Sequence, residues 1–201
     1  MRNLVLSLLV VLSSSCSVPM RTVEHEHEID VPVSAAWTVF SDFAAFAEWN
    51  ALSVELKIAG SGVGMTRTMD IEGIGRISER LDKLDHEKKQ LAYTLVEGTP
   101  LGMIEYHADV ALHAAGKDRT LIKWHGEFDA APGADLDTMA ENLKGSYQGM
   151  SEALGRYVAA TLRTGLPLTL PPKMQRTVDE QDSWQRTPST KDEPTNIFNE
   201  N

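Results

Sequence analysis

The sequence predicts an α+β domain in which a curved antiparallel sheet of about seven strands wraps around one long C-terminal helix. Three observations support this prediction. Residues 135–163 repeat apolar side chains every three or four positions, which is typical of an amphipathic helix, here roughly 40 Å long. Earlier segments alternate apolar and polar residues between short turns, which is typical of antiparallel strands. Two short apolar stretches, residues 35–40 and 43–49, follow the first strand and are expected to be helices.

The strands are predicted from their alternation. We expect them at residues 23–31, 54–58, 65–72, 75–84, 91–95, 104–112 and 121–128. Ser34 and Asp42 are placed to cap the two short helices. In two neighbouring strands a charged residue shares the apolar face, Arg67 in one and Glu79 in the next. Such a sheet has one solvent-exposed face, and the long helix is expected to cover the other, apolar face.

The long helix has clear start and stop signals. Asp135 can cap its first turn, while Gly165 and a proline two residues later end it. Its apolar face consists of Leu136, Met139, Ala140, Leu143, Tyr147, Met150, Leu154, Val158 and Leu162. Gly145, Gly149 and Gly155 each weaken helix propensity by up to about 1 kcal/mol. Either they keep bulk low beside a cavity, or they let the helix pack closely on the sheet.

Composition limits the class of protein. A chain of 201 residues with ordinary apolar and charged fractions forms one globular domain by default. Its formal net charge of -10, with scattered Lys and Arg, argues against a nucleic-acid surface. The glycine-rich segment 60–64 lacks the lysine and helix of a phosphate-binding loop. We expect no cofactor, and composition leaves the oligomeric state open.

Residues 1–16 have the pattern of a secretory signal, with Arg2, an apolar run and then small residues before Cys16, the only cysteine. A lone cysteine after such a run resembles the lipobox of bacterial lipoproteins, although Ser13 stands where that motif usually has leucine. The resemblance implies that Cys16 is lipidated and anchors an exported, periplasmic or outer-membrane protein to the membrane. The alternative is an ordinary signal peptide in which the cysteine is incidental.

The domain boundaries follow from these patterns. We expect a spacer at residues 17–21 and a folded domain at 22–164. Residues 165–201 are rich in Pro, Thr, Gln and charge, and we expect this tail to be disordered or loosely attached.

The order of elements resembles the helix-grip fold of the SRPBCC superfamily, which includes START lipid-transfer domains, pollen allergens and polyketide cyclase-like proteins. The resemblance is closest to the polyketide cyclase/dehydrase branch and spans residues 22–163. Its residues are HEIDVPVSAAWTVFSDFAAFAEWN at 27–50, GVG at 62–64, ISERLDKLD at 77–85, LAYTLVEG at 91–98 and TLIKWHGEFDA at 120–130. The resemblance implies the fold but no particular reaction, because the fold occurs in carriers and enzymes alike.

A sheet curled around one helix encloses more space than its side chains need to fill, so we expect an internal cavity that takes a small hydrophobic ligand. The residues expected to contact the ligand are Arg67, Met69, Glu79, Tyr93, Leu95, Tyr106, Trp124, Met139, Leu143, Tyr147 and Met150. Adaptable methionines and aromatic rings with polar tips suit a planar or lipid-like ligand. The same side chains would equally suit a filled hydrophobic core without a ligand.

Arg67 and Glu79 are the candidate catalytic residues, because inward-facing charges on neighbouring strands each need a partner. The guanidinium could hold a ligand carboxylate or enolate while the glutamate accepts a proton. The alternatives are a mutual ion pair, or charges that reach water at the sheet edge.

His25 and His27 form an HxH pattern on the inward side of the first strand and are the weak candidates for metal ligands. A metal site needs a third ligand, and Glu79 is the obvious inward acid. A polar cavity wall or an exposed strand start explains the two histidines better than a metal does. His107 and His125 have outward parity.

Three classes of function remain. The first is an exported, lipid-anchored binding protein for a small hydrophobic or lipid-like molecule. The second is a cyclase- or dehydratase-type enzyme acting on a polyketide-like or aromatic substrate, with Glu79 or a histidine as base, Tyr93 or Tyr147 as donor and Arg67 at an oxyanion. The third is a structural or partner-binding protein with a filled core.

Overall fold

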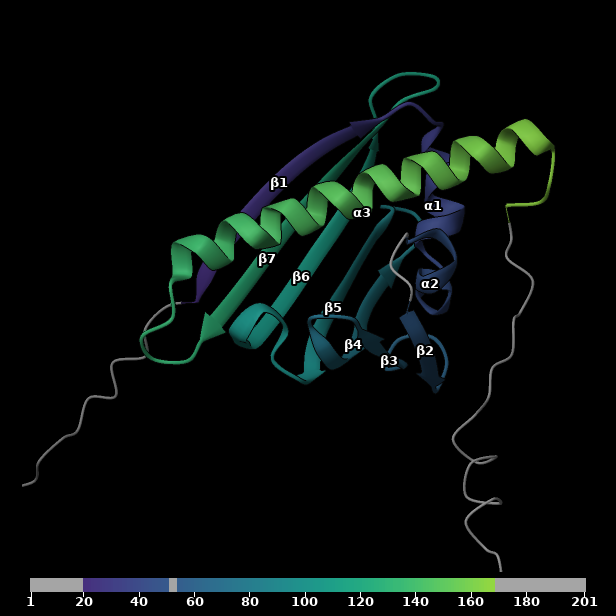
Figure 1. The fold of residues 1–201 in the computed structure, drawn as a ribbon. Coiled ribbons are helices and arrows are strands. Elements are labelled where there is room, and N and C mark those ends of the chain that lie inside the picture. Colours follow the sequence, from purple (N-terminus) through teal and green to yellow (C-terminus); the bar gives the residue numbers. More distant parts are fainter. Residues whose placement is uncertain (1–19, 51–53, 169–201) are drawn as a thin grey trace, which may run out of the picture.

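The computed structural model describes residues 20–50 and 54–168 (Figure 1). Cys16, most of the predicted spacer and the tail beyond Leu168 lie outside the described residues. The elements in chain order are β1 (Arg21–Ile29), α1 (Val33–Phe40), the 3-10 turn η1 (Phe43–Ala45), α2 (Phe46–Trp49), β2 (Val54–Ala59), β3 (Thr66–Ile71), β4 (Gly75–Asp85), β5 (Gln90–Glu97), the 3-10 turn η2 (Pro100–Gly102), β6 (Met103–Ala114), β7 (Thr120–Ala130) and α3 (Leu136–Thr164).

The seven strands form one antiparallel sheet in the order β1-β7-β6-β5-β4-β3-β2. From β2 to β7 each strand pairs with its neighbour in sequence, and β1 joins the free edge of β7. Register shifts interrupt the β4–β5 and β6–β7 pairs, and irregularities of this kind bend and twist a sheet. The predicted seven-stranded antiparallel sheet is confirmed.

The long helix α3 crosses one face of the sheet (Figure 1). Asp135 caps it as predicted, since its Oδ1 accepts from the Thr138 backbone N–H at 3.1 Å, and Gly165 ends it with a left-handed φ of 66°. At Gly155 an added Cβ would lie 3.0 Å from Ile29 of β1, so this glycine lets the helix pack closely on the sheet. Gly149 differs, because nothing lies within 4 Å of the place its Cβ would occupy.

Some local predictions are wrong, each for a physical reason. Ile104, predicted to point inward, is 48% exposed, because the register shift at the start of β6 buries Met103 instead. Neither Ser34 nor Asp42 caps a helix with its side chain; α1 begins after Pro32, whose φ of -62° suits a helix entry. The first strand also begins earlier than expected, because Arg21 already pairs with β7.

None of the helices in the described part of the chain is long and apolar enough to span a membrane.

Candidate functional site

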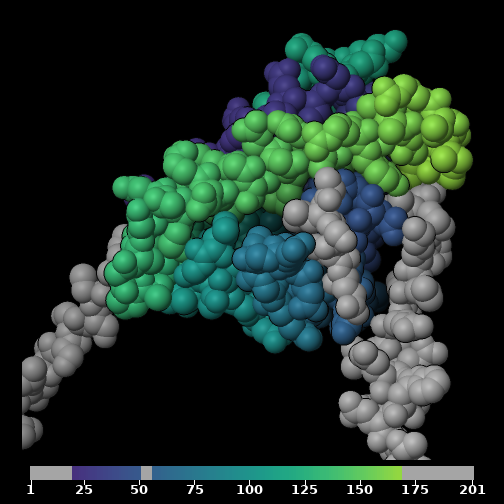
Figure 2. Space-filling view, viewed as in Figure 1, coloured from purple at the N-terminus to yellow at the C-terminus, as the bar shows by residue number. Residues whose placement is uncertain are grey.

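A cavity of about 400 Å³ lies between the sheet and α3. Figure 2 shows the molecule hollowed beneath α3 on this face. The inner wall comes from β3 to β6, and the helix contributes Leu143, Met150 and Ala153. The β3–β4 hairpin and the β5–β6 turn supply Ile74 and Leu101. The lining is therefore mostly apolar, as the sequence predicted for a cavity of this fold.

An ion pair is the charged feature of the inner wall. Arg67 of β3 and Glu79 of β4 are directly opposite each other in the antiparallel register, so both side chains point to the same side of the sheet. Arg67 Nε donates to Glu79 Oε2 at 2.8 Å, and Nη2 lies 2.7 Å from the same oxygen. Both residues are buried. The structure thus forms the mutual ion pair that was one alternative, and it places that pair against the cavity.

Aromatic rings surround the guanidinium of Arg67. Its Cζ lies 3.9 Å from the ring centre of Phe43, 4.3 Å from that of Phe46 and 5.3 Å from that of Tyr93. Nη1 also donates to the Phe43 backbone carbonyl at 3.5 Å. Cation–π contacts are worth about 0.5–1 kcal/mol at exposed sites and about 2 kcal/mol when desolvated, as here. The guanidinium is therefore held in one position by the short helices as well as by Glu79.

Three tyrosine hydroxyls form a hydrogen-bonded row that runs from the cavity wall, at Tyr93 and Tyr106, to Tyr147 in the core. Tyr93 and Tyr106 are 3.2 Å apart at their oxygens, and Tyr106 and Tyr147 are 2.9 Å apart. Burial raises the pKa of all three phenols well above their ordinary value of 10, so they remain protonated across the physiological range. They can donate hydrogen bonds but cannot act as bases there.

The innermost residue of the row, Tyr147, lies against Gly126 of β7. An added Cβ at this glycine would lie 2.0 Å from the Tyr147 hydroxyl. Tyr147 stacks on Trp124 at 4.7 Å between ring centres, and Trp124 Nε1 donates to Ser151 Oγ at 2.9 Å. Tyr147 and Trp124 are thus fixed in the core between β7 and α3.

The predicted contact residues divide into two groups. Those that border the cavity are Arg67, Met69, Glu79, Tyr93, Tyr106, Leu143 and Met150. Those that do not border it are Leu95, Trp124, Met139 and Tyr147, which pack in or against the hydrophobic core. Their roles in binding stay predictions.

Sequence reasoning missed several residues of the wall. They are Phe46, Asn50, Ile71, Ile74, Ile77, Pro100, Leu101, Met103, Ser146, Ala153 and Arg156. Ser146 and Ala153 could have been found, because they lie three positions from Leu143 and Met150 on the same helical face. Residues of the turns have no such periodic signal.

His25 and His27 lie side by side on β1, with stacked rings 6.1 Å apart. Burial lowers the pKa of His25, and the nearby His27 and Lys144 lower it further. Within residues 20–50 and 54–168, no three His, Cys, Asp or Glu side chains gather closely enough to hold a metal ion. The structure therefore gives the two histidines no third ligand among these residues.

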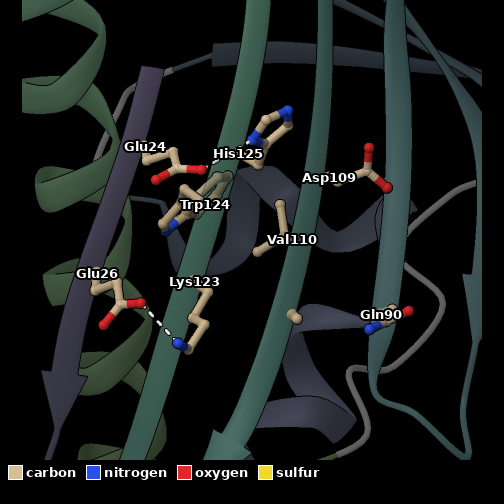
Figure 3. A pocket seen from close by; sticks show the side chains of 9 residues that line it. Glu24, Glu26, Gln90, Asp109, Val110, Lys123, Trp124 and His125 are labelled. Carbon is tan, nitrogen blue, oxygen red and sulfur yellow. Dashed lines mark hydrogen bonds and ion pairs between the residues drawn. The ribbon is translucent and has the colours of Figure 1, made fainter. Parts of the chain in front are cut away.

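A second hollow, of about 340 Å³, lies on the opposite, wet face of the sheet (Figure 3). Its charged groups contact one another: Lys123 Nζ lies 2.6 Å from Glu26, and the His125 ring lies 3.5 Å from Glu24. Both contacts are partly exposed, and pairs of this kind contribute about 0–1 kcal/mol. This face has the character of a solvated surface, as its outward parity predicted.

A curved antiparallel sheet closed by one long helix around a mostly apolar cavity defines a hydrophobic-ligand-binding fold of the helix-grip type. The chain belongs to the polyketide cyclase / dehydrase and lipid transport family, whose model matches residues 20–159.

Individual relatives agree with this assignment. Norbelladine synthase of Narcissus pseudonarcissus is 28% identical over 121 residues, which are 54% of this chain and 74% of that protein. Truncated norcoclaurine synthase of Thalictrum flavum superposes with a TM-score of 0.58 at 25% identity, over 71% of this chain and 96% of that one. The Zhui aromatase/cyclase of Streptomyces sp. R1128 gives a TM-score of 0.58 at 20% identity, over 73% and 98%. The last of these shows a shared fold only.

Proposed function

We propose that this protein binds a small, largely apolar molecule in the cavity between the sheet and α3. The observation that supports this best is the cavity itself, about 400 Å³ with a mostly apolar wall. Ligand sites of this size and character typically combine apolar walls with a few fixed polar groups. Here the fixed polar groups are the Arg67–Glu79 pair and the hydroxyls of Tyr93 and Tyr106.

We favour a binding protein over an enzyme because the polar groups already have partners. Both close contacts from Arg67 go to Glu79 Oε2, and the three tyrosine hydroxyls bond to one another. A catalytic base must instead reach a proton of the substrate. At the Arg67–Glu79 pair a ligand would therefore meet charges that already balance each other.

An enzyme of the cyclase or dehydratase kind is the second candidate, supported by the family and by a carboxylate, a phenol and a guanidinium on one wall. In such a reaction Glu79 would take a proton from the carbon next to a substrate carbonyl. The C–H electron pair would form the C=C bond of the enolate while the π pair of the C=O bond moves to oxygen, where Arg67 and Tyr93 could stabilise the negative charge.

The sequence also supports a proposed location. If Cys16 is lipidated, only four residues separate the anchor from Arg21, the first residue of β1. This short linker would hold the domain within about 20 Å of the membrane surface, since an extended chain spans at most about 3.6 Å per residue.

Native mass spectrometry of the purified chain after exposure to lipid extract tests the binding proposal. Leu143→Trp places bulk in the cavity and should abolish the captured mass, whereas Gln148→Trp, at an exposed position of the same helix, should not. A captured ligand that Leu143→Trp leaves unchanged would place the site elsewhere.

A second measurement separates carrier from enzyme. Deuterium uptake next to the carbonyl of a bound ketone, followed by NMR, should stay at the solvent rate for a carrier. Uptake that is faster than in buffer and lost in Glu79→Gln would favour the enzyme.

A further inference from the structure

Trp49 has a buried indole N–H that finds no acceptor among residues 20–50 and 54–168. The residue is 5% exposed and ends α2, packed against Phe46 and Phe40 with ring centres 5.1 and 5.9 Å away. In the described part of the chain its Nε1 has no hydrogen-bond partner. Most buried N–H groups in proteins have one, and a donor left without an acceptor costs stability. An unpaired indole N–H near a ligand cavity therefore needs an explanation.

A small void adjoins this tryptophan. It measures about 10 Å³, close to the minimum for one water molecule, and Trp49 borders it. Four of its wall residues, Phe46, Arg67, Tyr93 and Met150, also border the main cavity. The void is thus an inner neighbour of that cavity. Met150, with three rotatable side-chain bonds, can shift and join the two spaces.

The charges of the shared wall restrict what can enter. Arg67 is already neutralised by Glu79 at 2.7 Å, and both groups are buried. A ligand carboxylate would bring an additional buried negative charge beside Glu79, which is costly without a cation of its own. The donor available to a ligand acceptor is instead uncharged: the Trp49 indole N–H, which has no acceptor among the described residues.

We propose that Trp49 is a further ligand-binding residue, and that the cavity takes an uncharged molecule whose carbonyl oxygen accepts a hydrogen bond from the Trp49 indole N–H. This inference rests on the proposed binding function and names the chemical class of its ligand. The apolar body of the ligand would occupy the main cavity, and its oxygen would reach past Met150 toward Trp49.

Three probes of similar shape test the inference: 2-acetylnaphthalene, 2-isopropylnaphthalene and 2-naphthoate. By calorimetry with the intact chain, we expect the ketone to bind about threefold to tenfold more tightly than the hydrocarbon, the range of one net hydrogen bond. The carboxylate should bind at least tenfold more weakly than the ketone. Trp49→Phe removes the N–H and should equalise ketone and hydrocarbon while hydrocarbon affinity changes less than twofold.

Trp37→Phe is the matched control. Trp37 is equally buried, but its Nε1 already donates to His86 Nδ1 at 3.2 Å, so its loss should leave the ketone preference intact. Should Trp49→Phe fail to fold, indole ¹⁵N NMR of the unmodified chain gives the same answer, because the Trp49 N–H signal should move downfield with the ketone alone.

The possible failures are distinguishable. A ketone preference that survives in Trp49→Phe, or a Trp49 signal that the ketone does not move, overturns the role of this residue. Tighter binding of the naphthoate overturns the uncharged class. If no probe binds, or if binding is unchanged in Leu143→Trp, the proposed function itself fails and this inference with it.

Discussion

Gly126→Ala should destabilise the protein, and Tyr147→Phe should rescue it in part. The new Cβ would lie 2.0 Å from the Tyr147 hydroxyl, whereas ordinary contacts begin near 3.4 Å, so the phenol must retreat by more than an ångström. Tyr147 is fully buried, stacked on Trp124 and hydrogen-bonded to Tyr106, so it has no free direction of movement. Overpacking of this kind costs about 1–3 kcal/mol, and a lost buried hydrogen bond adds about 1 kcal/mol.

We therefore expect Gly126→Ala to lower the free energy of unfolding by about 2–4 kcal/mol, measured by urea denaturation followed with circular dichroism. Tyr147→Phe alone should cost about 1 kcal/mol, because Tyr106 keeps its bond to Tyr93. In the double variant the hydroxyl is absent and the nearest ring carbon, Cζ, is 3.2 Å from the new Cβ. The double variant should therefore lose at least about 1 kcal/mol less unfolding free energy than the two single variants lose together. Strict additivity would refute the contact.

Three further predictions concern the ion pair, a histidine and two glycines. Glu79→Gln should lower the free energy of unfolding, measured by urea denaturation, by about 2–4 kcal/mol, because it leaves the buried guanidinium of Arg67 uncompensated. Adding Arg67→Met should recover most of this loss. If Glu79→Gln alone costs less than about 0.5 kcal/mol, the pair is not buried as described. Burial, together with His27 and Lys144, lowers the folded-state pKa of His25, so its contribution to the free energy of unfolding should be complete above pH 6.5 and decline as the pH falls from there toward the lowered pKa. In His25→Gln the free energy of unfolding should therefore fall less between about pH 7.5 and 5.5 than in the unmodified chain. Equal declines in the two proteins would contradict the lowered pKa. Gly145→Ala should raise the thermal unfolding midpoint, because nothing lies within 4 Å of the new Cβ and alanine favours the helix by up to about 1 kcal/mol. Gly155→Ala should lower the midpoint, because its Cβ would press against Ile29 of β1. A higher midpoint in both variants would show that α3 does not pack tightly on β1 at Gly155.

The strand pattern and the helix were predictable because each has a periodic signal. Asp135 and Gly165 fixed the ends of α3, and the short turn between β3 and β4 placed Arg67 opposite Glu79. Periodicity cannot separate a cavity wall from a core, however, because both use inward apolar residues. Tyr147 was therefore expected at the ligand, although the missing side chain at Gly126 lets it sink into the core.

Trp49 shows the other limit of sequence reasoning. It ends a helix of four residues, too short for a periodic signal, and nothing in its neighbours reveals that its N–H lacks an acceptor within the described part of the chain. Turn residues such as Ile74 and Leu101 raise the same difficulty, because their positions depend on how the sheet bends. The polar features that decide ligand chemistry are thus the ones for which three-dimensional placement is needed.

The cavity itself has a cause in the backbone. α3 packs mainly against β1, with lesser contacts to α1, α2, η2 and β7. Each strand of a sheet is rotated by about 20–25° relative to the next, so the strands farthest from β1 turn away from a straight helix. A wedge of space then opens between α3 and β3–β6, and the ion pair borders it together with Tyr93 and Tyr106. Because sheet twist creates that space, replacing one large wall side chain by a smaller one should enlarge the cavity, and the rest of the cavity should stay open. Only added bulk, as in Leu143→Trp, should remove it.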